Sequence, residues 1–202
     1  MCAVLRENTA MANTKDQLAA ALKKMLAVKP IERITIRDIV EICGVNRQTF
    51  YYHFEDVYDL LEYVFESDAE KYLPKVIVYD RWKEDVAYYF RYLYDNRDFA
   101  ISLYHSNSRD YLLKYYHDKL KFCVESFAKI VSRNMVIEKG DFDFVVELYT
   151  NIVVGIISQW LGGGMAIPDW FTTDRCMEIM NNSVENLLMR FDRSERQHSE
   201  RL

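Results

Sequence analysis

Apolar residues recur at helical spacing along most of the chain, and no stretch alternates polar and apolar residues as a half-buried strand would. Only 3 prolines and 6 glycines occur among 202 residues, which favours long helices. The pattern predicts an all-α fold. The expected helices cover 13–28, 36–43 and 47–54, a long segment after Asp56, and then 81–95, 97–105, 108–135, 141–162 and 173–191.

The first helix has sequence signals at both ends. Thr14 and Gln17 have the spacing of a capping box, so we expect the helix to begin there. Pro30 disfavours helical backbone in the residue before it and therefore ends the helix. Residues 1–12 show no periodicity and are expected to form a disordered arm, with Met11 as an alternative start of the chain.

Two short helices separated by a glycine come next. Thr35 can cap the first of them, with Asp38 as its acidic partner three residues later. Gly44 supplies the backbone freedom for a tight turn, and Asn46 is a good cap for the helix over 47–54. A short helix, a glycine turn and a second helix rich in polar and aromatic groups indicate a helix-turn-helix.

The charge distribution agrees with a nucleic-acid-binding head on a larger body. The chain carries a net charge of −5, but residues 13–54 hold seven basic and four acidic side chains, a net charge of +3. The remaining residues therefore carry −8. A basic head on an acidic body is typical of a small DNA-reading domain attached to a dimerising domain, although a difference of three charges also arises by chance.

Residues 13–65 resemble the TetR/AcrR family of transcriptional regulators. The resemblance rests on Ile-Thr-Ile-Arg-Asp-Ile-Val at 34–40 and on residues 43–54, where Thr-Phe-Tyr-Tyr-His-Phe follows a Gly-Val turn. It implies a three-helix DNA-binding head over 13–58 and a helical body over 59–192 that dimerises through a four-helix bundle. Residues 193–202 are expected to form a polar tail. The implied partners are a palindromic double-stranded operator and a second copy of the chain.

The second short helix would then be the recognition helix, with its first turn at the base edges. Arg47 can grip guanine O6 and N7 with two hydrogen bonds, and Gln48 can do the same for adenine. The further contacts to phosphates or a thymine methyl are expected from Thr49, Tyr51, Tyr52 and His53. Tyr51 has the alternative of a packing position with its hydroxyl at the surface, and Arg47 that of a merely solvated side chain. Val45, Phe50 and Phe54 are expected in the core.

By the same resemblance, Arg37 reaches the groove from the preceding helix and Thr35 meets a phosphate. One position departs from the family pattern, because members often carry a phosphate-binding lysine near the start of the fourth helix. Here that position is Val57, beside Glu55 and Asp56. Acidic groups suit a helix N-terminus electrostatically but repel DNA. We therefore expect fewer phosphate contacts than the family usually makes.

The body is expected to dimerise through its last two long helices, since these pair between subunits in the family. Residues 150–165 resemble the penultimate helix of many TetR-type bodies, and loosely that of regulators linked with dihydroxyacetone kinase operons. Wide apolar faces allow both helices to contact their own core and a partner. These faces comprise Phe144, Val145, Leu148, Ile152, Gly155, Ile156 and Gln159, then Cys176, Ile179, Met180, Val184, Leu187, Leu188 and Phe191.

Aromatic residues are dense between Tyr79 and Phe127, where family members usually keep an effector pocket. A tyrosine has a flat apolar body and one polar end, which suits a pocket. The candidates are Tyr89, Tyr104, His105 and Tyr115, and the alternative for each is an ordinary core or surface position. The family pattern is a repressor that a small molecule or a protein effector releases from DNA.

Other functional classes have weaker support. The spacing of Ser126 and Lys129 fits the SxxK motif of some acyl enzymes, but its companion motifs are missing, so we expect no enzyme. A protein-interaction module that kept the fold without reading DNA is a further alternative. The four cysteines form no CxxC pair, which favours a reduced, cytoplasmic protein. No cofactor or metal is expected. No membrane span is expected either, because no apolar run approaches ~20 residues.

Overall fold

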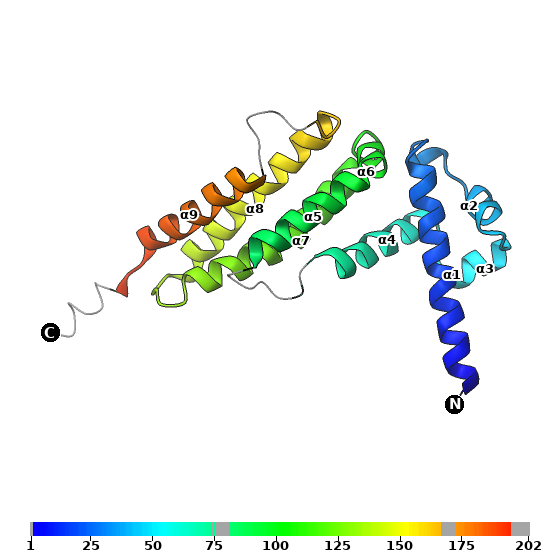
Figure 1. The fold of residues 1–202 in the computed structure, drawn as a ribbon, viewed down its shortest axis with the longest axis horizontal. Coiled ribbons are helices and arrows are strands. Elements are labelled where there is room, and N and C mark those ends of the chain that lie inside the picture. The colour runs from blue at the N-terminus through cyan, green and yellow to red at the C-terminus, as the bar shows by residue number, and fades with distance from the viewer. Residues whose placement is uncertain (1, 74, 76–80, 167–172, 195–202) are drawn as a thin grey trace. The chain divides into compact units, whose positions relative to one another are not determined.

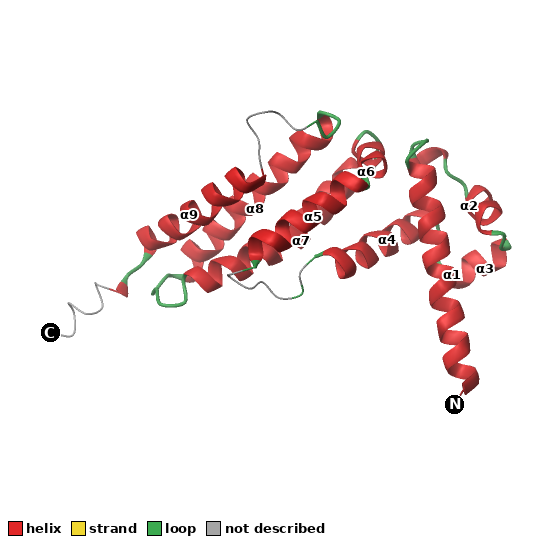
Figure 2. Cartoon of the chain, in the orientation of Figure 1, coloured by secondary structure: helices red, strands yellow, loops and turns green. Residues whose placement is uncertain are grey.

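The computed structural model describes residues 2–73, 75, 81–166 and 173–194, and within these ranges it contains helices and no strand (Figures 1 and 2). The first four helices are α1 (Cys2–Leu26), α2 (Ile36–Cys43), α3 (Arg47–His53) and α4 (Val57–Tyr72), with a 3-10 turn η1 (Ile31–Arg33) after α1. The others are α5 (Trp82–Asp95), α6 (Arg97–Tyr104), α7 (Arg109–Val131), α8 (Lys139–Gly162) and α9 (Thr173–Phe191).

The predicted helices are confirmed in number and type, and most of their ends agree within two residues. The largest difference is at the start of α1, which begins at Cys2 instead of near residue 13. Thr14 therefore lies inside a helix and does not cap one. Residues 2–12 contain no proline or glycine and are rich in good helix formers such as alanine, leucine and methionine, which explains the longer helix.

The chain divides into two compact units, which we call the head unit and the body unit. The head unit comprises residues 1–71 and 96–110, and the body unit comprises residues 72–95 and 111–202. The head unit thus holds most of α4 and all of α6, whereas the sequence had assigned residues 59–192 to the body. Pro74, where a kink was expected, and residues 195–202 of the predicted tail lie outside the described residues.

Fully buried side chains from five helices form the core of the head unit. They are Leu18, Leu22, Leu26, Ile39, Phe50, Leu60, Leu61 and Leu103. Leu103 belongs to α6, which packs against α1. A long-range hydrogen bond supports this packing, because the backbone N–H of Asn107 donates to the Glu32 carboxylate at 2.8 Å. The ring of Phe99 on α6 also lies 6.2 Å from that of Phe65 on α4.

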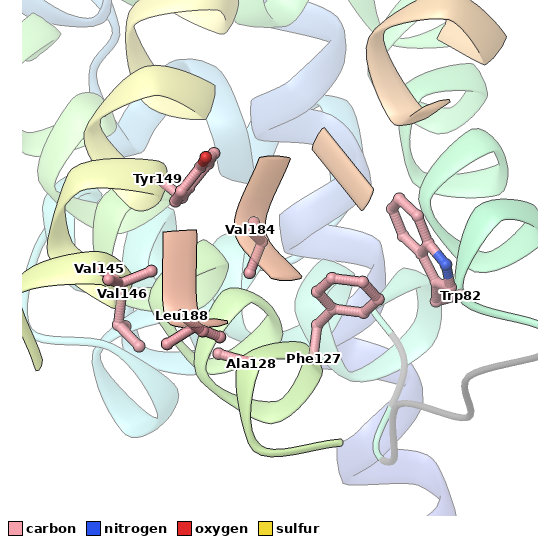
Figure 3. Packing of buried hydrophobic residues seen from close by; sticks show 8 residues of the cluster. All are labelled: Trp82, Phe127, Ala128, Val145, Val146, Tyr149, Val184 and Leu188. Atoms are coloured by element: carbon pink, nitrogen blue, oxygen red, sulfur yellow. The ribbon is translucent and has the colours of Figure 1, made fainter. Parts of the chain in front are cut away.

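The body unit is built around a cluster to which four helices contribute (Figure 3). Its buried members are Trp82 from α5, Phe127 and Ala128 from α7, Val145, Val146 and Tyr149 from α8, and Val184 and Leu188 from α9. Helices α8 and α9 contact each other and lie side by side in the ribbon (Figure 1). Several residues expected to form a dimer face are thus committed to the subunit's own core.

Among the described residues, one helix, α8, is long and apolar enough to cross a membrane when only length and composition are considered. The sequence had predicted no such segment, because charged and polar residues interrupt its apolar runs. In the structure 44% of its most apolar stretch is buried inside the body unit. The core helices of many proteins pass the same test, so this observation is weak evidence for a membrane span.

Candidate nucleic-acid interface

A capping box fixes the start of α2, as predicted. The Thr35 hydroxyl accepts a hydrogen bond from the backbone N–H of Asp38 at 3.2 Å, and the Asp38 carboxylate accepts one from the backbone N–H of Thr35 at 3.0 Å. The Lys29 ammonium lies 2.8 Å from the same carboxylate. These hydrogen bonds, of which the one from Lys29 is the strongest, lower the pKa of Asp38 from 3.8 to about 2.

The turn between α2 and α3 depends on a glycine in the left-handed conformation. Gly44 has φ 66° and ψ 26°, a region that other L-residues adopt only at a cost. Asn46 then caps α3, because its side-chain oxygen accepts hydrogen bonds from the backbone N–H of Thr49 at 2.8 Å and from the Thr49 hydroxyl at 3.1 Å. The predicted caps of α2 and α3, Thr35 and Asn46, are both confirmed. The Thr49 hydroxyl is already hydrogen-bonded to the Asn46 cap.

Helix α3 has a buried face and an exposed face. Phe50 is 0% exposed, and Phe54 at its C-terminal end is 4% exposed, so both anchor the helix in the head core as predicted. Val45 is half-buried. The exposed face carries the candidate DNA-reading side chains Arg47, Gln48, Tyr51 and Tyr52, the last two being 59% and 68% exposed.

The remaining candidates on this helix are less accessible. Thr49 and His53 are half-buried. The pKa of His53 lies below its usual 6.5, mainly because burial disfavours the charged ring and also because of the nearby positive charge of Lys15. The His53 ring lies edge-on to the Tyr52 ring, with 5.0 Å between centroids. At neutral pH His53 is therefore an uncharged hydrogen-bonding group.

Thr35, which caps α2, and Arg37, which lies on α2, are exposed. The Arg37 side chain is held by a neighbour one helical turn away, since its Nε donates to Oε1 of Glu41 at 2.7 Å. This hydrogen bond and the negative charge of Glu41 raise the pKa of Arg37 above its usual value. The sequence interpretation did not include Glu41, although its spacing of four residues from Arg37 is a readable signal.

The acidic start of α4 has a structural role. Oδ1 of Asp56 accepts hydrogen bonds from the backbone N–H groups of Tyr58 at 2.7 Å and Asp59 at 2.9 Å, which confirms the predicted cap. The Asp59 carboxylate accepts a hydrogen bond from the backbone N–H of Glu55 at 2.8 Å. Val57 is half-buried as the first residue of α4, so this position offers no phosphate-binding group.

Contacts between α1 and α4 hold the end of the recognition helix. The Lys15 ammonium lies 5.4 Å from the centre of the Phe54 ring and 5.3 Å from that of Tyr63, within cation–π distance. The Tyr63 hydroxyl donates to Asp16 at 3.1 Å. No local pattern of residues indicates these contacts, because 47 positions separate Tyr63 from Asp16. Lys15 is therefore occupied within the head unit.

The four candidate effector residues fall in different units. Tyr89 is buried and Tyr115 half-buried in the body unit, whereas Tyr104 and His105 belong to the head unit. Tyr104 already has a partner, because Arg109 donates to its hydroxyl at 2.8 Å and lies 4.4 Å from its ring centre. The reason for the division is that α6 packs against α1.

Buried tyrosines surround Tyr89. Tyr92 and Tyr116 are buried as well, and the ring of Tyr92 stacks on that of Tyr72 with 3.8 Å between centroids. Burial, followed by the neighbouring tyrosines, raises the pKa of Tyr89 well above its usual 10. These rings form a continuous aromatic region inside the body unit, formed by residues that the sequence interpretation had considered individually.

The SxxK spacing does not form a catalytic pair in the described residues. Ser126 is half-buried on α7, and the exposed Lys129 forms an ion pair with Glu125 instead. Across the described ranges, no group of three or more histidine, cysteine, aspartate or glutamate side chains could hold a metal ion. The exposed face of α2 and α3 is the part of the head unit where groups suited to DNA gather.

Comparison with known proteins places both halves of the chain. A model described as bacterial regulatory proteins, tetR family, matches residues 15–64, and a model of a transcriptional regulator C-terminal region matches residues 80–182. The HTH-type dhaKLM operon transcriptional activator DhaS of Lactococcus lactis is 29% identical over 86 residues, which are 43% of this chain. The match spans 46% of that relative, about half of its length.

Solved structures with the same fold include two that cover most of this chain. The dihydroxyacetone kinase operon activator DhaS superposes with a TM-score of 0.65 at 18% identity and covers 88% of this chain and 96% of its own. A TetR transcriptional regulator from Streptococcus agalactiae gives 0.64 at 17% identity, over 90% and 99% of the two chains. At these identities the likeness concerns the fold.

Proposed function

The chain belongs to the tetR family of bacterial regulatory proteins, and we propose that it acts in the cytoplasm as a homodimer whose two α3 helices read a palindromic operator. Membership makes it a DNA-binding transcriptional regulator. The observation that carries the finer proposal is the exposed face of α3. Arg47, Gln48, Tyr51 and Tyr52 lie there on a helix that Phe50 and the Asn46 cap hold in place.

Each exposed group has a chemical role in this proposal. Arg47 makes no hydrogen bond or ion pair among the described residues, so its guanidinium is available for a guanine edge. Gln48 can read adenine in the same way. Tyr51, Tyr52 and the uncharged His53 donate to phosphates and fix the register of the helix in the groove. Thr35 adds a phosphate contact and Arg37 a groove contact from α2.

The exposed apolar residues of α8 and α9 support the dimer. Phe144, Leu148 and Ile152 are 57%, 38% and 41% exposed and follow one another every four residues along α8. On α9, Ile179 is 59% and Met189 51% exposed. Large apolar side chains in contiguous stripes usually mark an interface. Pairing α8 and α9 with their copies would build the four-helix bundle that the sequence predicted.

We further propose that the chain represses its target and that an effector releases it from DNA. The aromatic region around Tyr89 is the candidate effector site, with Tyr115 at its half-buried edge. Tyr104 and His105 remain candidates only for transmitting the signal, since they belong to the head unit. The name of the curated relative describes an activator, so a reporter gene with and without the protein decides the sign.

The test is a band-shift titration with duplexes selected by the protein from random DNA, comparing wild type with Arg47→Ala. We expect a palindromic consensus and a loss of about 1–3 kcal/mol in operator affinity for the variant, the value of one good bidentate base contact. Gln48→Ala should relax the preference at the neighbouring base pair. If Arg47→Ala binds the operator as tightly as wild type, α3 is excluded as the reading helix.

A further inference from the structure

Arg37 and Glu41 form an ion pair one turn apart on α2. Both side chains are largely exposed, at 70% and 61%, and both lie on the helix that precedes the recognition helix. The contact is a single short hydrogen bond of 2.7 Å from Nε of the arginine to Oε1 of the glutamate. An exposed pair of this kind contributes little to the stability of a helix.

Its orientation along the helix is unfavourable for stability. Arg37 lies in the first turn of α2, where the positive end of the helix dipole repels a cation, and Glu41 lies closer to the negative end. Pairs with the acidic residue on the N-terminal side are the more stabilising ones. Helix stability therefore does not account for this order of charges.

The hydrogen bond to Glu41 leaves the two terminal nitrogens of Arg37 available to a base. Glu41 occupies Nε, while the two terminal nitrogens of Arg37 make no hydrogen bond among the described residues. An end-on arginine presents those two nitrogens to O6 and N7 of guanine. The other nearby carboxylate is engaged elsewhere, because Asp38 pairs with Lys29 and caps α2. Glu41 is thus the acidic group that orients this guanidinium.

We propose that Glu41 is a specificity-determining positioning residue, which holds Arg37 in the conformation that reads a guanine and offsets its charge toward phosphates. The proposal rests on the proposed function, in which Arg37 enters the groove. Holding the side chain in advance reduces the conformational entropy lost on binding. The adjacent carboxylate repels the phosphate backbone, so a DNA site gains from Arg37 mainly where a guanine meets its terminal nitrogens.

The variants Glu41→Gln and Glu41→Ala separate the two effects. Glutamine keeps the length and one acceptor oxygen but loses the charge, whereas alanine loses the acceptor as well. Glu62→Gln is the matched control. Glu62 is an exposed acid on α4 in the same head unit, so its substitution by glutamine removes the same charge. Thermal unfolding of each variant checks that the head remains folded.

The measurement is a set of anisotropy titrations with the selected operator, with single-base variants of it, and with a scrambled duplex. Arg37→Ala identifies the base pair whose identity Arg37 reads. We expect Glu41→Gln to bind the scrambled duplex about threefold more tightly and to lose about threefold to tenfold of the discrimination at that base pair. Glu41→Ala should lose more of this discrimination, because it lacks the acceptor oxygen as well. In an Arg37→Ala background, Glu41→Gln should leave the discrimination unchanged.

Equal discrimination in Glu41→Gln and Glu62→Gln would overturn the proposal, and so would a loss that persists without Arg37. The proposed function fails in a different way. If Arg47→Ala loses the operator while Arg37→Ala binds it normally, α3 still reads DNA, whereas the groove contact of Arg37 and the role of Glu41 are both refuted. If Arg47→Ala also binds normally, or if no preferred sequence can be selected, both proposals fail together.

Discussion

Helices α3 and α8 both leave large side chains exposed, but the chemistry of the exposed groups is opposite. On α3 the exposed groups are an arginine, a glutamine and two tyrosines, which keep their polar ends in water. On α8 they are Phe144, Leu148 and Ile152, which have no polar end. An exposed apolar side chain lowers the free energy of association by about 25 cal/mol per Å² that a partner covers.

This contrast indicates which kind of partner suits the exposed surface of each helix. Polar groups with many donors are stable in water and remain available for phosphates and base edges. Apolar stripes gain little from water and gain from a matching apolar surface. The two exposed surfaces of the chain are therefore suited to a nucleic acid and to a protein, respectively.

The largest effect should come from the buried face of α3. Phe50→Ala empties a fully buried position and should destabilise the head unit by about 3–5 kcal/mol in denaturant unfolding. Tyr51→Ala on the exposed face of the same helix should change stability by no more than about 0.5 kcal/mol. Equal losses for both variants would show that the two faces of α3 are not distinct.

A charge in the apolar stripe of α8 should weaken the dimer. Leu148→Glu is expected to raise the dissociation constant of the dimer at least about tenfold, or about 1.4 kcal/mol, because the carboxylate must lose water on association. Sedimentation velocity measures the change. Phe122→Glu on α7, which is 50% exposed, is the control and should leave the association unchanged. Identical behaviour of the two variants would argue against α8 as the interface.

The cap of α3 should have a smaller effect on stability. Asn46→Ala removes the acceptor for the Thr49 backbone N–H and should cost about 1 kcal/mol in unfolding free energy. Asn46→Ser keeps a capping oxygen and should stay close to wild type. If alanine were tolerated as well as serine, the cap would not be what fixes the start of the recognition helix.

The smallest effects concern acid stability, for which each unit has a described carboxylate whose pKa is lowered to about 2. The pKa of Asp38 in the head unit falls from 3.8 to about 2, with Lys29 as the main cause, and that of Glu147 in the body unit falls from 4.5 to about 2, with Lys121 and then His117 as causes. A lowered pKa stabilises the native state above the usual pKa, and this contribution is lost as the pH falls toward about 2.

Asp38→Asn and Glu147→Gln should each flatten the loss of stability in this acid range. Tryptophan fluorescence separates the units, since Trp82 and Trp160 are in the body unit and residues 1–71 and 96–110 contain no tryptophan. We expect Glu147→Gln to change the fluorescence transition and Asp38→Asn to change only the transition seen by circular dichroism. A fluorescence change in Asp38→Asn would contradict independent contributions.

Local signals explain why so much of the head was predictable. Thr35, Gly44, Asn46 and Asp56 act on backbone groups within about four residues, so their roles can be read from the sequence, and the structure confirms each of them. Phe50 was predictable for a similar reason, because its spacing places it opposite the polar residues of α3. The Arg37–Glu41 pair has a local spacing too, but the interpretation did not use it.

Long-range contacts explain what the sequence could not predict. The bond between Glu32 and Asn107 joins residues 75 positions apart, and nothing near either residue indicates the other. The assignment of α6 to the head unit follows from such contacts, and it separates Tyr104 from Tyr89 among the effector candidates. In the body unit, periodicity predicted the helices well but could not decide which apolar residues of α8 face the core, because its apolar face is too wide.

The membership of α6 in the head unit has a consequence for engineering and for evolution. The head is made from two separate stretches of chain, so it is not a cassette that a single cut can remove. A chimera that transplants only residues 1–71 would leave behind Leu103 and the partner of Glu32. Regulators with exchanged specificity should therefore be built by resurfacing α2 and α3 in place, and recombination between relatives should succeed only when both stretches travel together.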